Sequence, residues 1–175
     1  MTDRYTGDQV ISASNPDWAR ETPRGYWDPS RMLLRAVRRY QAVERRGGIA
    51  AWLAGKKHAL CHGFWSVITQ AEVPLNSRIE GGLKLPHPNG VVIHPGTKIG
   101  PNCILFQQVT LGTSGNGPGA PVIGGGVDIG AGAKVLGAVT IGDHAIIGAN
   151  AVVTQDIPEG AIAAGVPARI IGKRW

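Results

Sequence analysis

The chain has 175 residues, of which 43% are hydrophobic, and it contains 26 glycines and 12 prolines. This composition is too apolar for a disordered chain and favours many short elements separated by turns. The formal net charge is +6, and residues 1–70 hold 11 Lys and Arg against 6 Asp and Glu. Such an excess suits an anionic nucleic acid or membrane surface. Because no aromatic-basic motif accompanies it, we favour a solvated helix face and expect no nucleic acid partner.

The sequence carries no targeting or spanning signal that we recognise. Its beginning, MTDRYTGDQVISASNPDW, is polar and lacks the apolar run of a signal peptide. No stretch of about 20 apolar residues is available to span a membrane. The two cysteines, Cys61 and Cys103, form neither a disulfide framework nor a CxxC motif. These features predict a cytoplasmic protein.

The first part of the chain predicts an arm followed by a short helical cap. Residues 1–27 have no regular pattern and indicate an arm or loop. Asp28 and Pro29 are typical of the N-cap and first residue of a helix, and Gly47 and Gly48 of its end. A second helix is predicted over residues 49–68. We therefore divide the chain into an N-terminal arm and helical cap, residues 1–70, and a second domain, residues 71–175.

From residue 73 onward the sequence repeats every six residues. An aliphatic residue opens each repeat, and a small or apolar residue follows four positions later. A fixed period of this kind outweighs local preferences and predicts a parallel β-helix with three flat sides per coil. Both positions should face the core, so Cys103 is predicted to be a core residue and not a nucleophile. The predicted core contains Ile99, Leu105, Leu111, Ile123, Ile129, Val135, Ile141, Ile147 and Val153, with Val109, Val127, Ala133, Val139, Ala145 and Ala151; upstream it contains Ile93 and, displaced by two residues, Val73, Ile79 and Leu85.

Four phrases within residues 70–172 resemble the serine acetyltransferases, which belong to the hexapeptide acyltransferases. They are LKLPHPNGVVIHPGTKIG, QQVTLGT, IGAGAKVLGAVTIG and AAGVPARIIG. The resemblance implies a mainly β fold, a left-handed parallel β-helix of hexapeptide repeats, that assembles as a homotrimer. It also implies an enzyme that moves acetyl from acetyl-CoA to a hydroxyl and needs no metal.

One histidine stands in an unusually stiff segment, KLPHPNG. Pro86 and Pro88 fix their φ angles and remove two backbone donors on either side of His87. The two-residue displacement of the repeat at this point predicts a bulge that holds the imidazole away from the prism face, ready to act as a base. The resemblance matches His87 to the family's general base. It matches Glu72 to the aspartate that orients that histidine, although Glu72 is one methylene longer.

Outward positions 18 residues apart should stack, because three sides make one coil. Thr113, Ala131 and Ala149 then form a column of small residues against which a thin pantetheine arm could lie. His87 and Gln107 fall on the neighbouring side, so we expect the small column of one chain to face the His87 side of the next. With the resemblance, these positions imply cofactor binding by Gly112, Thr113, Ala131, Ala149 and Arg169, and an acceptor pocket at Gln107 and Asn89; amides near Gly112 would stabilise the oxyanion.

The sequence departs from the family where the acceptor should bind. The family holds its substrate carboxylate with an Arg-His pair in the loop after VTLG, whereas TSGNGPGAPVIGG contains no Arg, Lys or His. Pro86 replaces the aspartate that usually precedes the histidine. The short helical cap predicts a single trimer, and the ending GKRW differs from the family's tail, so we expect no cysteine synthase partner.

The sequence is compatible with several functions. The acceptor is serine or a similar small hydroxy compound, or instead a sugar or exopolysaccharide intermediate, in which case the basic N-terminal helices could make peripheral membrane contact. A zinc enzyme resembling the γ-carbonic anhydrases would need three imidazoles, and the repeats contain only His87, His94 and His144. A prism that binds or assembles without catalysis is the last alternative.

Overall fold

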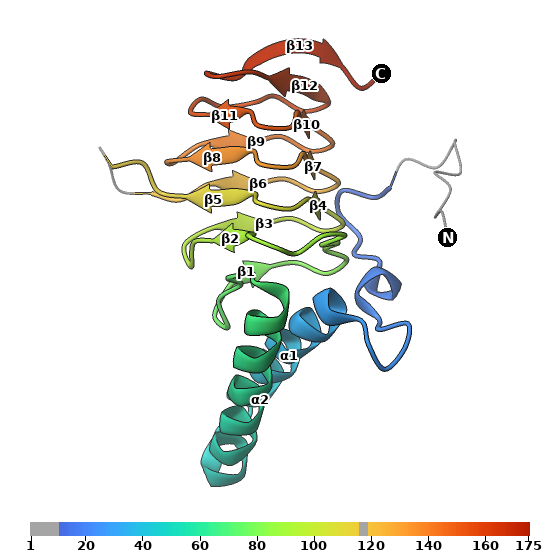
Figure 1. Ribbon diagram of the computed structural model, residues 1–175, viewed down its shortest axis with the longest axis vertical. Coiled ribbons are helices and arrows are strands. Elements are labelled where there is room, and N and C mark those ends of the chain that lie inside the picture. The colour runs from blue at the N-terminus through green and yellow to red at the C-terminus, as the bar shows by residue number, and fades with distance from the viewer. Residues whose placement is uncertain (1–10, 116–118) are drawn as a thin grey trace.

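A three-sided β-helix forms the larger part of the chain, and a helical hairpin extends from its N-terminal end (Figure 1). The computed structural model describes residues 11–115 and 119–175. A short 3-10 helix, η1 (Trp18–Glu21), precedes the hairpin of α1 (Pro29–Glu44) and α2 (Gly48–Thr69). The predicted fold class, a left-handed parallel β-helix with a short helical cap, is confirmed.

The strands form three parallel sheets, one on each side of the prism. The first side holds β1 (Arg78–Ile79), β3 (Lys98–Ile99), β6 (Val122–Ile123) and β9 (Thr140–Ile141). The second side holds β4 (Ile104–Leu105), β7 (Asp128–Ile129), β10 (Ile146–Ile147) and β12 (Ala161–Ala164). The third side holds β2 (Val92–Ile93), β5 (Thr110–Gly112), β8 (Lys134–Leu136) and β11 (Val152–Val153). The last strand, β13 (Arg169–Lys173), pairs antiparallel with β12 and ends the prism.

The inward positions predicted from the repeat are all buried. The aliphatic residues of successive coils stack on one another, as in the pairs Leu105 with Ile129 and Ile129 with Ile147. Cys103 is fully buried among them, and this burial raises the pKa of its thiol to about 12. The prediction that Cys103 is a core residue is therefore confirmed.

Coil length varies at three places, and two of them affect the site. The strands of a regular coil pair 18 residues apart, as Val122 and Thr140 do, whereas the last coil is two residues shorter, since Ile146 pairs with Ile162. Lys84 pairs with Ile104, a step of 20, whereas Val92 pairs with Thr110, a step of 18. The two extra residues therefore fall between Leu85 and Val92, and the predicted displacement at the histidine is confirmed. A second excess, of six residues, lies between β5 and β6, since Thr110 pairs with Lys134.

The N-terminal arm is attached to the prism through a buried turn residue. Asn102 has a φ of +62° and an almost fully buried side chain. Its Nδ2 donates to the carbonyls of Ser12 and Asn15, both at 2.8 Å, and its Oδ1 accepts from the Asp17 amide, also at 2.8 Å. One side chain therefore satisfies three backbone groups of the arm.

The hairpin is less well covered than the prism. Helix α1 begins at Pro29 as predicted and buries Leu33, Leu34, Ala36 and Val37. Asp28 occupies the N-cap position but does not cap; its carboxylate accepts from the Arg24 amide and from Arg31 instead. Only one of the 22 residues of α2, Thr69, is buried. Within residues 11–115 and 119–175, no helix is both long and apolar enough to cross a bilayer.

Candidate active site

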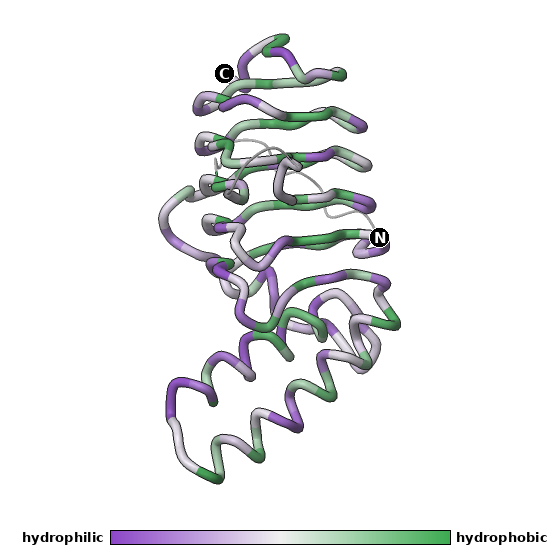
Figure 2. The backbone as a smooth tube through the Cα atoms, turned by 90° about the vertical axis from the view of Figure 1, so that its left-hand side faces the viewer, coloured by the Kyte–Doolittle hydropathy of each residue, from purple (hydrophilic) through white to green (hydrophobic). Residues whose placement is uncertain are grey.

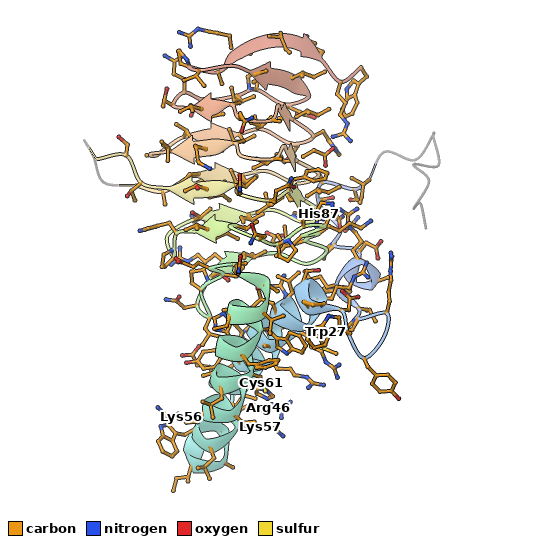
Figure 3. All side chains as sticks on the ribbon, viewed as in Figure 1. Trp27, Arg46, Lys56, Lys57, Cys61 and His87 are labelled. Atoms are coloured by element: carbon orange, nitrogen blue, oxygen red, sulfur yellow. The ribbon has the colours of Figure 1, made fainter. Side chains whose placement is uncertain are left out.

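His87 lies at the corner where the chain passes from the second side of the prism to the third. The imidazole is exposed and makes no hydrogen bond with any residue that the structure describes. It stands on the prism above the hairpin (Figure 3). After the histidine the chain turns tightly, and the Val91 amide donates to the Pro88 carbonyl at 3.1 Å. An uncommitted imidazole on a proline-stiffened turn is available to a ligand.

The turn that carries His87 is held from below by the end of α2. Gln70, the C-cap residue, has a φ of +53° and accepts from the Gly90 amide at 2.8 Å. Its Oε1 also accepts from Nδ2 of Asn89. From above, the Gln108 amide donates to the Asn89 carbonyl at 2.9 Å. Asn89 therefore fixes the turn through its bonds to Gln70 and Gln108. Sequence reasoning missed the part played by Gln70, because this contact joins a residue of the cap to a residue of the prism.

The backbone hydrogen bonds define a different column from the one predicted. The Gln108 amide bonds the Asn89 carbonyl, the Gly132 amide bonds the Gln107 carbonyl, and the Asn150 amide bonds the Ala131 carbonyl, at 2.8 to 2.9 Å. Asn89, Gln107, Ala131 and Ala149 therefore stack directly, and we call them the corner column. His87 lies in the bulge just before Asn89, not beneath Gln107.

Two expectations are corrected by this column. Thr113 does not stack with Ala131; it follows β5 on the third side, where Gly112 pairs with Leu136. The reason is that six extra residues lie between β5 and β6, so residues on either side of them that are 18 apart do not stack. The small residues and the histidine also do not lie on different sides, because Ala131, Ala149 and the His87 bulge share one corner of one chain.

Glu72 lies beside this corner but is not joined to the imidazole. It begins the third side, where its amide donates to the Val91 carbonyl at 2.8 Å and its carbonyl accepts from the Ile93 amide at 2.9 Å. Its side chain is exposed, and no hydrogen bond joins it to His87. Its orienting role stays a prediction.

Polar and charged groups accompany the corner column along its length. Oε1 of Gln107 is buried and has no hydrogen-bond partner within the described part of the chain. Nζ of Lys134, on β8, reaches the corner and donates to the Gln108 carbonyl at 2.5 Å. Arg169 is exposed and follows the turn in which the Gly165 carbonyl accepts from the Val152 amide at 3.0 Å. Sequence analysis missed Lys134, although it lies within the motif GAGAKVLG, because strand spacing does not reveal that a side chain bends to a corner.

The residues of the site do not resemble a metal centre. Across residues 11–115 and 119–175, no group of three or more His, Cys, Asp or Glu side chains is arranged to hold a metal ion. His94 accepts from the Gly96 amide, and His144 packs its ring against Trp175 at 5.3 Å between centroids. The geometry therefore gives no support to the zinc alternative.

The comparisons with known proteins agree with the fold. A profile of the family described as bacterial transferase hexapeptide (six repeats) matches residues 120–155. The chain is 45% identical over 108 residues to a serine acetyltransferase of Helicobacter pylori, covering 61% of this chain and 63% of the relative. It is 44% identical over 110 residues to that of Escherichia coli K12, covering 62% of this chain and 40% of the relative. The chain thus spans less than two thirds of the length of both relatives.

Solved structures are similar over more of the chain. The serine acetyltransferase from Brucella abortus in complex with coenzyme A superposes with a TM-score of 0.73 at 31% identity, covering 84% of this chain and 57% of that one. The serine acetyltransferase from Vibrio cholerae gives a TM-score of 0.71 at 34% identity, covering 84% and 55%. The resemblance to serine acetyltransferases is confirmed.

Proposed function

We propose that the chain is an acetyl-CoA-dependent O-acetyltransferase in which the thioester lies beside His87 and the pantetheine arm follows the corner column. The observation that carries this proposal is the stacking of Ala131 and Ala149 at the same corner as the His87 bulge. Small side chains let a thin ligand approach the backbone closely. A similar solved structure is a complex with coenzyme A, which supports this donor.

In the proposed reaction His87 is first a base and then an acid. The neutral imidazole takes the proton from the acceptor hydroxyl while the oxygen attacks the thioester carbonyl carbon. The carbon–sulfur bond then breaks, the acetyl group stays on the acceptor oxygen, and the thiolate of CoA takes the proton from the imidazolium. Glu72 would fix the imidazole tautomer, and amides near Gly112 would stabilise the oxyanion.

The cofactor-binding residues in this proposal surround the corner column. Ala131 and Ala149 flank the pantetheine arm, and Arg169, above them, is a cation for the phosphates of CoA. Gly112 and Thr113 contribute from the end of β5, on the adjoining side. Gln107 and Asn89 would contact the acceptor, with the unpartnered Oε1 of Gln107 accepting from its hydroxyl.

L-Serine or a similar small hydroxy compound is the acceptor that the relatives favour, since those we compared are serine acetyltransferases. The sequence TSGNGPGAPVIGG after β5 favours a second candidate, because it offers no Arg, Lys or His to a substrate carboxylate. A sugar or exopolysaccharide intermediate presents hydroxyls and does not need that cation. The two candidates share the donor and the base.

The proposed enzyme is a single homotrimer in the cytoplasm and does not bind cysteine synthase. Sedimentation of the purified protein should give three times the mass of the chain, and addition of cysteine synthase should not change it. A hexamer, or a complex with cysteine synthase, would contradict this part of the proposal.

The test is release of free CoA from acetyl-CoA by the purified protein, with L-serine, homoserine, threonine, sugars and nucleotide sugars as acceptors. His87→Ala should lower the rate by about 100-fold or more, as expected for loss of a general base. His94→Ala is the matched control, an exposed histidine of the same coil, and should retain the wild-type rate. Release with serine alone would support the first acceptor, and release with sugars alone the second.

Measuring CoA binding shows whether a variant that has lost activity is still folded and still binds the donor. Calorimetry should show that His87→Ala binds CoA within about twofold of the wild type, because the base acts on the acceptor proton. An equal loss of binding and turnover would contradict the general-base assignment. Binding of CoA without turnover on any acceptor would instead support a prism that binds but does not catalyse.

A further inference from the structure

Helix α2 presents a row of large apolar side chains to solvent. Ile49, Leu53, Leu60, Phe64 and Val67 recur at helical spacing along one face, and we call them the α2 stripe. Their exposed fractions range from 54% to 81%. The stripe extends over 18 helical steps from Ile49 to Val67, or about 27 Å at the helical rise of 1.5 Å per residue. Figure 2 shows hydrophobic positions recurring to the far end of the hairpin, beyond the prism.

The hairpin does not need this stripe for its own packing. Trp65 packs against the core and lies edge-on to Trp27, with 5.6 Å between ring centroids. A continuous exposed apolar face of this extent marks an interaction surface. Its occupant must therefore come from outside the described part of the chain.

The charge around the stripe is almost entirely positive. Residues 29–69 contain eight Arg and Lys and a single acidic residue, Glu44, and α2 itself has no Asp or Glu. Lys56 lies within the stripe, its Nζ 5.5 Å from the ring centroid of Trp52. Arg46 and Lys57 lie at a similar level of the distal hairpin, across α2 from Lys56 in this view (Figure 3). No carboxylate of residues 11–115 or 119–175 forms an ion pair with these three cations.

A neighbouring histidine responds to the same positive charge. The pKa of His58 is lowered, first by burial and then by the charges of Arg39 and Lys57. The surface thus combines an apolar face with cations of α2 and of the turn before it that no carboxylate of the described residues neutralises.

The combination of apolar side chains and positive charge distinguishes between two possible occupants of the stripe, a second copy of the chain and a lipid bilayer. A second copy packed stripe against stripe would bring two Lys56 side chains together with no acidic residue of α2 to neutralise them, which costs binding energy. An anionic bilayer offers acyl chains to the stripe and phosphates to the lysines, as amphipathic interfacial helices require. Trp52 suits the boundary between these layers.

We propose that α2 binds parallel to the surface of an anionic lipid bilayer, with the α2 stripe among the acyl chains and Arg46, Lys56 and Lys57 at the headgroups. The hairpin projects from the end of the prism (Figure 1), so the prism does not lie over the outer part of the stripe. This inference is independent of the proposed transfer reaction, because it uses none of the residues at the corner column.

Sedimentation with lipid vesicles tests the proposal on the full chain. Vesicles of equimolar phosphatidylcholine and phosphatidylglycerol should bind the protein at least tenfold more tightly than phosphatidylcholine alone, and salt should weaken the binding. Leu60→Glu should lower the affinity by about tenfold or more. Ile171→Glu, which changes a comparably exposed apolar residue on β13, should lie within about twofold of the wild type. Lys56→Gln with Lys57→Gln should cost about fivefold for each charge removed.

Two controls keep the outcomes separate. Circular dichroism and thermal melting should show that Leu60→Glu is folded, and its acetyl transfer in lipid-free solution should match the wild type. Equal binding to neutral and anionic vesicles, or no binding to either, would overturn the proposal. The proposal would also be overturned if the wild type formed an oligomer larger than a trimer and Leu60→Glu dissociated that oligomer. This result would assign the stripe to self-association.

Discussion

The prism and the hairpin of this chain bury their apolar side chains to very different extents. In the prism, Leu105 and Ile129 have no measurable exposure, whereas Leu60 in α2 is 77% exposed. Each coil of the prism is covered by the coils above and below it, so the repeat supplies its own core. Two helices can cover only one face of each other. The prism therefore completes its core within the chain, while the hairpin leaves an apolar surface exposed.

The largest expected effect on stability is that of a Leu→Ala substitution in the prism, which we compare with the same substitution in the hairpin. Leu105→Ala should lower the free energy of unfolding by about 2–5 kcal/mol, because it leaves a cavity in a close-packed coil. Leu60→Ala should change it by no more than about 0.5 kcal/mol in lipid-free solution, since Leu60 is exposed. Denaturant titrations of both variants provide the measurement. A similar loss for both would show that the stripe is covered in solution.

The arm lies between these two extremes, because polar contacts attach it to the prism, and Asn102 makes three of them. Asn102→Ala should cost about 1–3 kcal/mol, since three backbone groups of the arm lose their partner. Asn102→Gly removes the same bonds but accommodates the positive φ, so it should be less destabilising than Asn102→Ala by about 1 kcal/mol. Thermal unfolding and proteolysis of the arm measure both. If the two variants unfold at the same temperature, backbone strain contributes nothing to stability at this turn.

A smaller effect is expected on the outside of the prism. Ala131→Phe places a bulky ring on the corner column and should weaken CoA binding by about tenfold, or about 1.4 kcal/mol. Val122→Phe alters an outward residue on the opposite side and serves as the control, with unchanged CoA affinity. Calorimetric titration of both variants tests the column. Unchanged affinity in Ala131→Phe would move the cofactor away from this corner.

The smallest expected effect is a difference in chemical reactivity between the two cysteines, which is measured without any substitution. Cys61 is exposed on α2, whereas Cys103 is buried in the prism with a thiol pKa of about 12. Since the thiolate is the reactive form, a disulfide reagent at pH 8 should modify Cys61 at once and Cys103 only after unfolding. Mass spectrometry of the modified protein identifies the residue. Rapid labelling of Cys103 in the native state would show that the coils open locally.

The prism, its core and the displaced position of the histidine could all be predicted from the amino-acid sequence. The six-residue period recurs in every coil, so inward residues such as Ile129 follow from local spacing alone. The displacement at His87 was equally visible, because two extra residues break a six-residue frame. The helical cap followed from Pro29 and the glycine pair, although α1 already ends at Glu44 and the two glycines are the N-cap and first residue of α2.

Which outward residues share a corner could not be predicted from the sequence and is visible only in the folded chain. Six extra residues lie between β5 and β6, and an insertion of one whole period leaves the frame intact. Sequence spacing therefore counted these residues as a side of the prism and placed Thr113 beneath Ala131, where the structure has Gln107. The contact of Gln70 with Asn89, the reach of Lys134 to the corner and the exposure of the α2 stripe were hidden for a related reason. Each depends on which segments meet in space, and the repeat carries no information about that.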